Sequence, residues 1–122
     1  MKIKEIAFSV YAVSDIKKSR KFYEGVLGLV PNSDFPATDE SYWIEYNIGP
    51  STLGIGQSEA WKPSEDGASV ALEVEDFEEA IRELKEGGVK FFVEPSDFPT
   101  CNMAVVQDPD GNKICIHKRK GK

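Results

Sequence analysis

The chain has 122 residues, of which 40% are hydrophobic and 30% charged, a composition typical of folded proteins rather than disordered or fibrous ones. Its length suits one domain with a real hydrophobic core. The net charge of −6 argues against a nucleic acid partner, because the phosphate backbone is itself negative. No apolar run approaches the roughly 20 residues needed to cross a membrane, and the N-terminus lacks a secretion signal. We therefore expect a cytoplasmic protein without a membrane partner.

The first half of the chain predicts one helix among four strands. Residues 6–13 are mostly apolar, β-branched or aromatic, which favours a strand. Asp15 is a good N-cap for a helix with an apolar stripe over 16–27, and Gly28 is expected to end it. Three further strands are expected at 29–35, 42–48 and 52–57, with a connector at 36–40 and a turn at 49–51.

A polar stretch at 59–66 is expected to be a linker, after which the pattern starts again. Residues 69–74 alternate as a strand, and Asp76 with Glu79 forms an Asp version of a capping box at the start of a helix. The glycine pair at 87–88 is expected to end that helix. Three more strands are expected at 89–93, 102–106 and 113–117.

The stretch from Asp108 to Gly111 is predicted to be a turn that precedes the last strand. Its proline fixes one φ angle, and Gly111 is free to adopt a positive one. Polar and apolar residues alternate in the strand that follows. Its two isoleucines should therefore face one side of the sheet, and Cys115 and His117 the other.

The two halves match each other at an offset of about sixty residues. Residues 13–16 correspond to residues 74–77, and both segments carry the aspartate that should cap a helix. An internal repeat constrains every element at once, so we predict an α+β fold of two βαβββ modules. The modules are expected at 1–58 and 67–122, joined by the linker at 59–66 in a single domain.

These paired motifs resemble the vicinal oxygen chelate superfamily, which includes glyoxalase I, extradiol dioxygenases and bleomycin resistance proteins. The residues that carry the resemblance are Asp15, 22–24, 27–29, 69–76, 87–89 and 108–112. It implies a mixed sheet curled around a cup, with the helices outside. It also implies a homodimer in which the partner chain completes the cups.

The metal enzymes of this superfamily place His, Glu or sometimes Gln ligands at cup-facing positions of the first and last strands of each repeat. The corresponding positions in this chain hold Phe8, Gly54, Ser69 and Cys115. A phenyl ring and a glycine offer a divalent cation no ligand atom, and a single thiol is not a site. We therefore expect no metal and no other cofactor, and the sequence argues against an enzyme.

The resemblance instead favours a protein that binds an apolar or aromatic small molecule in the cup, as the bleomycin resistance proteins do. The residues expected to line the cavity are Phe8, Trp43, Glu45, Ser69, Met103, Cys115 and His117. Trp43 could equally be a core residue, and Trp61 could cap the cup or pack across a dimer. His117 could also be a half-exposed surface residue, and both cysteines are expected to be structural.

Two alternatives stay open. Glu45, Glu73 and His117 could form a displaced metal site in a glyoxalase-like lyase or dioxygenase. Metal analysis of the purified protein separates this alternative from metal-free binding. In the other alternative the cup is filled, and the protein is a structural or interaction module. Ligands that bind the folded state raise its unfolding temperature, so thermal-shift screening separates this alternative from a binding protein.

Overall fold

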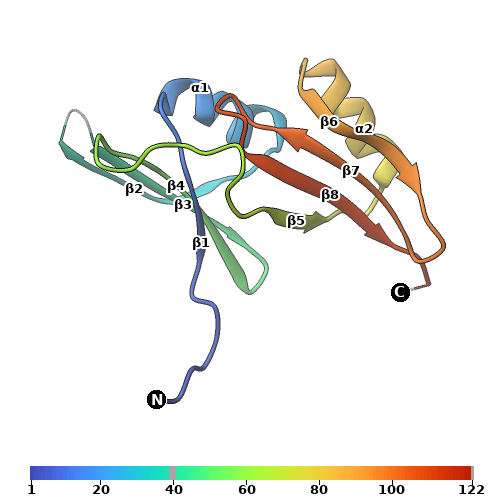
Figure 1. Ribbon diagram of the computed structural model, residues 1–122, viewed down its shortest axis with the longest axis horizontal. Helices are drawn as coiled ribbons and strands as arrows, with labels where there is room; N and C mark the ends of the chain where they lie inside the picture. The colour runs from blue at the N-terminus through green and yellow to red at the C-terminus, as the bar shows by residue number, and fades with distance from the viewer. Residues whose placement is uncertain (39–40, 122) are drawn as a thin grey trace. The chain divides into compact units, whose positions relative to one another are not determined.

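The computed structural model describes residues 1–38 and 41–121, with the side chains of 33–38 and 41 left aside. The chain divides into two compact units, Met1–Pro63 and Ser64–Lys122. In each unit a helical segment lies on one face of a four-stranded mixed sheet (Figure 1). We describe each unit by itself.

The two units repeat one topology. The first unit contains β1 (Ser9–Ala12), α1 (Ile16–Arg20), the π-helical segment η1 (Lys21–Val26), β2 (Pro31–Thr38), β3 (Ser41–Ile48) and β4 (Ser51–Gln57). The second contains β5 (Val70–Glu73), α2 (Phe77–Glu86), β6 (Lys90–Asp97), β7 (Cys101–Gln107) and β8 (Lys113–Arg119). Their strand orders are β1-β4-β3-β2 and β5-β8-β7-β6, with the first pair of each sheet parallel. The predicted α+β fold of two βαβββ modules is confirmed.

The predicted helix signals act as expected in both units. The Asp15 side chain accepts hydrogen bonds from two backbone N–H groups of the first turn of α1, and Asp76 accepts one in α2. These bonds satisfy donors that have no partner within the helix. Gly28 and Gly88 follow the helices with φ angles of 75° and 70°, a conformation that favours glycine.

The first helix differs from the expected continuous α-helix, because its second half is a π-helix. The N–H of Leu27 donates to the carbonyl of Phe22, a step of five residues, at 3.0 Å. A π-turn is wider than an α-turn and brings more consecutive residues to one face. Phe22 and Tyr23 are accordingly both buried, with exposed fractions of 6% and 0%. The sequence pattern does not distinguish the two helix types over so short a segment.

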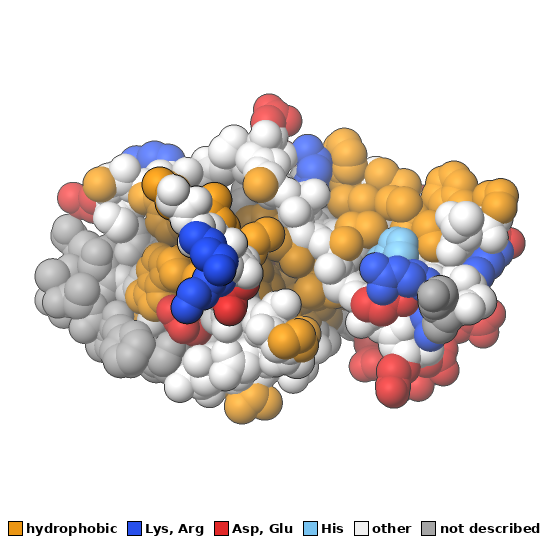
Figure 2. Space-filling view, turned by 90° about the horizontal axis from the view of Figure 1, so that it is seen from below, with side chains coloured by type: hydrophobic (Ala, Val, Ile, Leu, Met, Phe, Trp, Pro, Cys, Tyr) orange, Lys and Arg blue, Asp and Glu red, His pale blue; other side chains and the backbone are white. Residues whose placement is uncertain are grey.

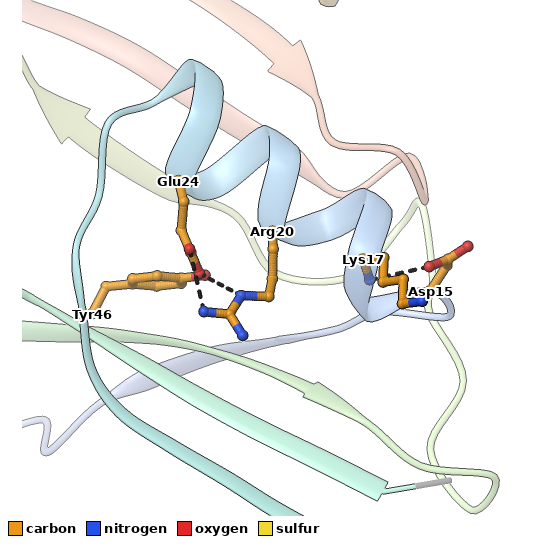
Figure 3. A network of polar contacts seen from close by, with 5 residues as sticks. All are labelled: Asp15, Lys17, Arg20, Glu24 and Tyr46. Atoms are coloured by element: carbon orange, nitrogen blue, oxygen red, sulfur yellow. Dashed lines mark hydrogen bonds and ion pairs between the residues drawn. The ribbon is translucent and has the colours of Figure 1, made fainter. Parts of the chain in front are cut away.

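A polar network ties this helix to its sheet (Figure 3). The buried Tyr46 hydroxyl of β3 donates to Glu24 Oε2 at 2.9 Å, and Arg20 Nε donates to the same oxygen at 2.8 Å. The Tyr46 ring also stacks on Tyr23, with 6.2 Å between ring centroids. Oε2 of Glu24 therefore accepts from two residues, and the helix is fixed over β3 by polar and apolar contacts together.

Several strand ends differ from prediction. β1 begins at Ser9 rather than residue 6, since its pairing with β4 begins at Ser9 and Leu53. β2 and β6 run on to Thr38 and Asp97, beyond their predicted ends at residues 35 and 93, and each extension contains a proline. Both are edge strands with register shifts, where a missing N–H is tolerated. The rest of the predicted connector at 36–40 lies outside the described residues.

Each core lies between a sheet and its helix. The buried strand residues include Ile44, Tyr46, Leu53 and Ile55 in the first unit, and Ala104, Val106, Ile114 and Ile116 in the second. In β3, β7 and β8 they alternate with less buried residues, as the period of a strand requires. In β4 the glycines on either side of Ile55 are buried as well. The predicted orientation of the last strand is thus confirmed, with its isoleucines on the core side.

Candidate functional site

We call the face of each sheet that lies opposite its helix the open face. Because side chains alternate along a strand, the residues between buried positions belong to this face. In the first unit these are Trp43 and Glu45 on β3, with Gly54 and Gly56 opposite them on β4. In the second unit they include Met103 on β7 and both Cys115 and His117 on β8.

Three aromatic side chains gather on the open face of the first unit, and we call Phe8, Trp43 and Trp61 the aromatic cluster. The Phe8 ring meets the Trp43 ring edge to face, with 5.6 Å between centroids. A Cβ atom added to Gly56 would lie 2.8 Å from Trp61 Cζ3 and 3.2 Å from Trp43 Cε3. Both indoles therefore lie directly over Gly56, and the absence of a side chain there makes room for them.

The cluster keeps a fixed orientation and an accessible surface. Trp43 Nε1 donates to Glu45 Oε2 at 2.7 Å, which fixes the plane of the indole on the sheet. Phe8 and Trp61 keep exposed fractions of 45% and 38%. Aromatic rings that are oriented but not covered can pack against a planar ligand, and the Glu45 carboxylate lies beside them as a polar group.

A carboxylate and an imidazole meet on the open face of the second unit. His117 Nδ1 lies 2.6 Å from Glu73 Oε1, and the backbone N–H of Arg119 donates to Glu73 Oε2 at 2.7 Å. The Arg119 N–H lowers the pKa of the Glu73 carboxyl group, and the hydrogen bond from His117 lowers it further. Figure 2 shows the single histidine at the surface, beside acidic and basic side chains.

This pair predicts a pH-dependent contribution to stability. The pKa of Glu73 in the folded chain lies below the ordinary value of 4.5. The interactions of the ionised Glu73 carboxylate therefore stabilise the fold fully above pH 4.5. This stabilisation is lost as the pH falls through the lower pKa that Glu73 has in the folded chain. We expect Glu73→Gln to lower the thermal midpoint at neutral pH, and the difference from wild type to shrink on acidification.

Thermal unfolding of both proteins across the acid range measures this difference. Glu83→Gln, the same chemical change on the exposed side of α2, is the matched control and should show no such convergence. A Glu73→Gln difference that stays constant at all pH values would contradict the assignment.

Two other predicted site residues are Ser69 and Cys115, and neither takes part in the aromatic cluster or the Glu73–His117 pair. Ser69 immediately precedes β5 and is exposed. Cys115 pairs in register with Ala71 on β5 and is half-buried, as is Cys101 at the start of β7. Burial raises the pKa of the Cys115 thiol, and the nearby Cys101 adds to this rise. A thiol with a raised pKa is a weak nucleophile at neutral pH, so the geometry gives Cys115 no catalytic activation.

The four positions at which the resemblance implies metal ligands hold residues that do not suit a divalent cation. Phe8, Gly54 and Ser69 supply no carboxylate or imidazole, and Cys115 supplies one thiol. Among the described residues, no group of three or more His, Cys, Asp or Glu side chains is arranged to hold an ion. The residues of the alternative, displaced metal site have other hydrogen-bond partners. Glu45 accepts from Trp43 in the first unit, and Glu73 and His117 are hydrogen-bonded to each other in the second.

Sequence reasoning left one feature of these faces open and missed another. It left Trp61 between a cap on the cup and a dimer contact, because the residue belongs to a segment without periodicity. The two glycines on either side of Ile55 could have indicated its place, because they leave the open face of β4 without side chains at these two positions. The other is the backbone N–H of Arg119, which carries no side-chain signature.

The chain belongs to the Glyoxalase/Bleomycin resistance protein/Dioxygenase superfamily, whose sequence profile matches residues 2–116. A search of curated proteins found no match. No helix in the described part of the chain has the length and hydrophobicity to span a membrane.

Several solved structures share the fold. TnmS3, an antibiotic binding protein from Streptomyces sp. CB03234, is 24% identical with a TM-score of 0.82, over 98% of this chain and 99% of its own. A glyoxalase family protein from Enterococcus faecalis is 27% identical with a TM-score of 0.72, over 93% and 97% of the two chains. A superfamily member from Sphaerobacter thermophilus DSM 20745 is 23% identical with a TM-score of 0.75, over 96% and 98%.

Proposed function

We propose that this protein binds an apolar or aromatic small molecule on the open faces of its sheets, without a metal ion. The observation that carries the proposal is the aromatic cluster. Phe8, Trp43 and Trp61 lie over a strand stretch that has glycines instead of side chains, and two of the three rings keep substantial exposed area. Partly exposed rings of this kind are costly to leave in water and suit a planar ligand.

The chemistry of the second unit supports the same proposal. Its open face carries Met103 and Cys115, which are soft and polarizable, next to the Glu73–His117 pair. Methionine adapts its shape to ligands and makes favourable contacts with aromatic rings. A surface that combines apolar side chains with a few well-placed polar groups is typical of small-molecule sites. TnmS3, which has the same fold, is an antibiotic binding protein, and we extend that class of role to this chain as part of the proposal.

Binding without metal is tested by combining metal analysis with ligand titration. We expect substoichiometric Zn, Ni, Mn and Fe in protein purified without chelator. We also expect planar aromatic compounds to raise the thermal midpoint equally with and without a chelator, because binding to the folded state stabilises it by mass action. A stoichiometric metal whose removal abolishes binding would support the lyase or dioxygenase alternative. A protein that responds to none of the compounds would support the structural module.

We also propose that the protein acts as a homodimer in the cytoplasm. Supporting the dimer are the exposed apolar side chains of the N-terminal segment, Ile3 and Ile6, at 81% and 82% exposure. Supporting the cytoplasm are the two free cysteines, which suit a reducing compartment. Light scattering after size exclusion gives the mass in solution, and a monomer at all accessible concentrations would rule out the dimer.

A further inference from the structure

The Glu73–His117 pair occupies positions at which the first unit has small residues. Val13 N donates to Gly56 O in the first unit, and Val74 N donates to His117 O in the second, both at 2.9 Å. Ala12 pairs in register with Gly56, and Glu73 pairs in register with His117. The same fold thus forms around an alanine and a glycine, so the topology does not require a carboxylate and an imidazole at this point.

The geometry of the pair determines which ring nitrogen is available. Both oxygens of Glu73 are used, one by His117 Nδ1 at 2.6 Å and the other by the Arg119 N–H at 2.7 Å. A carboxylate beside Nδ1 favours the neutral tautomer that carries its proton there, which leaves a lone pair on Nε2. Within the part of the chain that the structure describes, Nε2 has no hydrogen-bond partner, and the His117 side chain is 25% exposed.

Soft and apolar side chains flank the imidazole along the sheet. Met103 lies opposite His117 on β7, and Ala71 and Cys115 form the next pair on this face of β5 and β8. Glu73 lies on the Nδ1 side of the ring, and Arg119 follows two residues further along β8. The available acceptor is therefore next to a soft, weakly polar surface formed by Met103, Ala71 and Cys115. Such a surface recognises an aromatic compound that has one hydroxyl group on its ring, because the ring contacts the apolar side chains and the hydroxyl donates to the nitrogen.

We propose that the Glu73–His117 pair selects ligands with a phenolic hydroxyl, which donates its hydrogen bond to His117 Nε2 while Glu73 positions the ring. This inference rests on the proposed binding function, and it specifies the class of ligand. Glu73 is a positioning residue, and His117 is the residue that contacts the ligand. A phenol is a stronger donor than an aliphatic alcohol, and a carboxylate behind the imidazole strengthens the acceptor.

The tautomer is tested on the free protein by long-range proton–nitrogen NMR. The chain has one histidine, so the imidazole signals need no assignment. We expect neutral His117 to carry its proton on Nδ1 in the wild type and in the Glu83→Gln control. We expect Glu73→Gln to lose this preference, because the carboxylate uses a separate oxygen for each donor and an amide replaces one of these oxygens with an NH₂ donor. A proton on Nε2 in the wild type would overturn the proposal.

Ligand selection is tested with 2-naphthol and its methyl ether 2-methoxynaphthalene. The ether has a methyl group in place of the hydroxyl hydrogen and cannot donate a hydrogen bond. We expect the wild type to bind the naphthol about tenfold more tightly than the ether. His117→Phe keeps a ring at this position but has no acceptor nitrogen, and we expect it to bind the two compounds equally. Glu73→Gln should reduce the preference, and Glu83→Gln should retain it.

The two compounds separate this inference from the binding function on which it rests. Equal affinity of the wild type for both, or a naphthol preference that survives His117→Phe, overturns the role of the pair and leaves aromatic binding supported. Failure of the wild type to bind either compound counts against the binding function itself, and the selection of phenols falls with it.

Discussion

Replacing Asp108 with alanine is expected to lower the free energy of unfolding by about 3–5 kcal/mol, a large share of the stability of a domain of this size. Asp108 is 5% exposed. Its Oδ1 accepts from the backbone N–H groups of Asp110 and Asn112 at 2.9 Å each, and its Oδ2 accepts from Asn112 Nδ2 at 2.8 Å. The alanine variant removes this acceptor from all three donors, and the loss of a buried hydrogen-bond acceptor costs about 1–3 kcal/mol for each donor that becomes unsatisfied.

The turn around Asp108 also sets the register of β8. The N–H of Gly111 donates to the Asp108 carbonyl at 3.0 Å, and Gly111 has a φ angle of 86° that suits glycine. The strand that follows pairs Lys113 with Gln107, and this register places His117 on the open face. A shift by one residue would turn every side chain of β8 to the opposite face.

Urea unfolding followed by circular dichroism measures the Asp108 effect. Asp108→Asn keeps one acceptor oxygen, and the amide of Asn112 can rotate to accept from the new amide, so we expect a smaller loss than for alanine. Glu94→Ala removes an exposed carboxylate from β6 and should change stability by less than about 0.5 kcal/mol. An Asp108→Ala protein as stable as the Glu94→Ala control would show that the turn does not depend on these bonds.

The parts of the fold that could be predicted from the sequence are those governed by local rules. Asp15 and Asp76 cap helices because their side chains reach backbone donors two or three residues away. The alternation in β8 predicts which side chains share a face, since a strand has a period of two. The repeat extends these local signals to the whole topology, because each motif occurs twice in the same order.

The features that could not be predicted depend on distant partners. The ends of β1 and β6 are set by the strands they pair with, and their own residues do not fix the length of that pairing. The Glu73–His117 contact joins residues 44 positions apart and requires the parallel register of β5 and β8. The sequence grouped Glu45 and Glu73 with His117 as a possible displaced metal site, and it did not indicate which of them lies beside the imidazole. The register of the second sheet places Glu73 directly beside it.

Replacing Trp43 with alanine is expected to weaken the binding of planar aromatic ligands by about thirtyfold, a change of about 2 kcal/mol. The indole is the centre of the aromatic cluster, since it meets the Phe8 ring edge to face and lies over Gly56. Its loss removes the main stacking surface and leaves the Glu45 carboxylate without the Nε1 donor that it accepts from at 2.7 Å. A charged group without this partner further disfavours an apolar ligand.

Two variants separate stacking from general loss of structure. Trp43→Phe keeps an aromatic ring but not the donor to Glu45, so we expect its affinity for 2-methoxynaphthalene to stay within about fivefold of wild type. Phe98→Ala removes an aromatic side chain of the second unit that is 46% exposed and does not belong to the aromatic cluster, and it should leave affinity unchanged. Titration by fluorescence or calorimetry gives these values, with thermal midpoints measured in parallel. If Trp43→Ala folds and binds like the Phe98→Ala control, the aromatic cluster is not the ligand surface, and the binding function loses the observation that carries it.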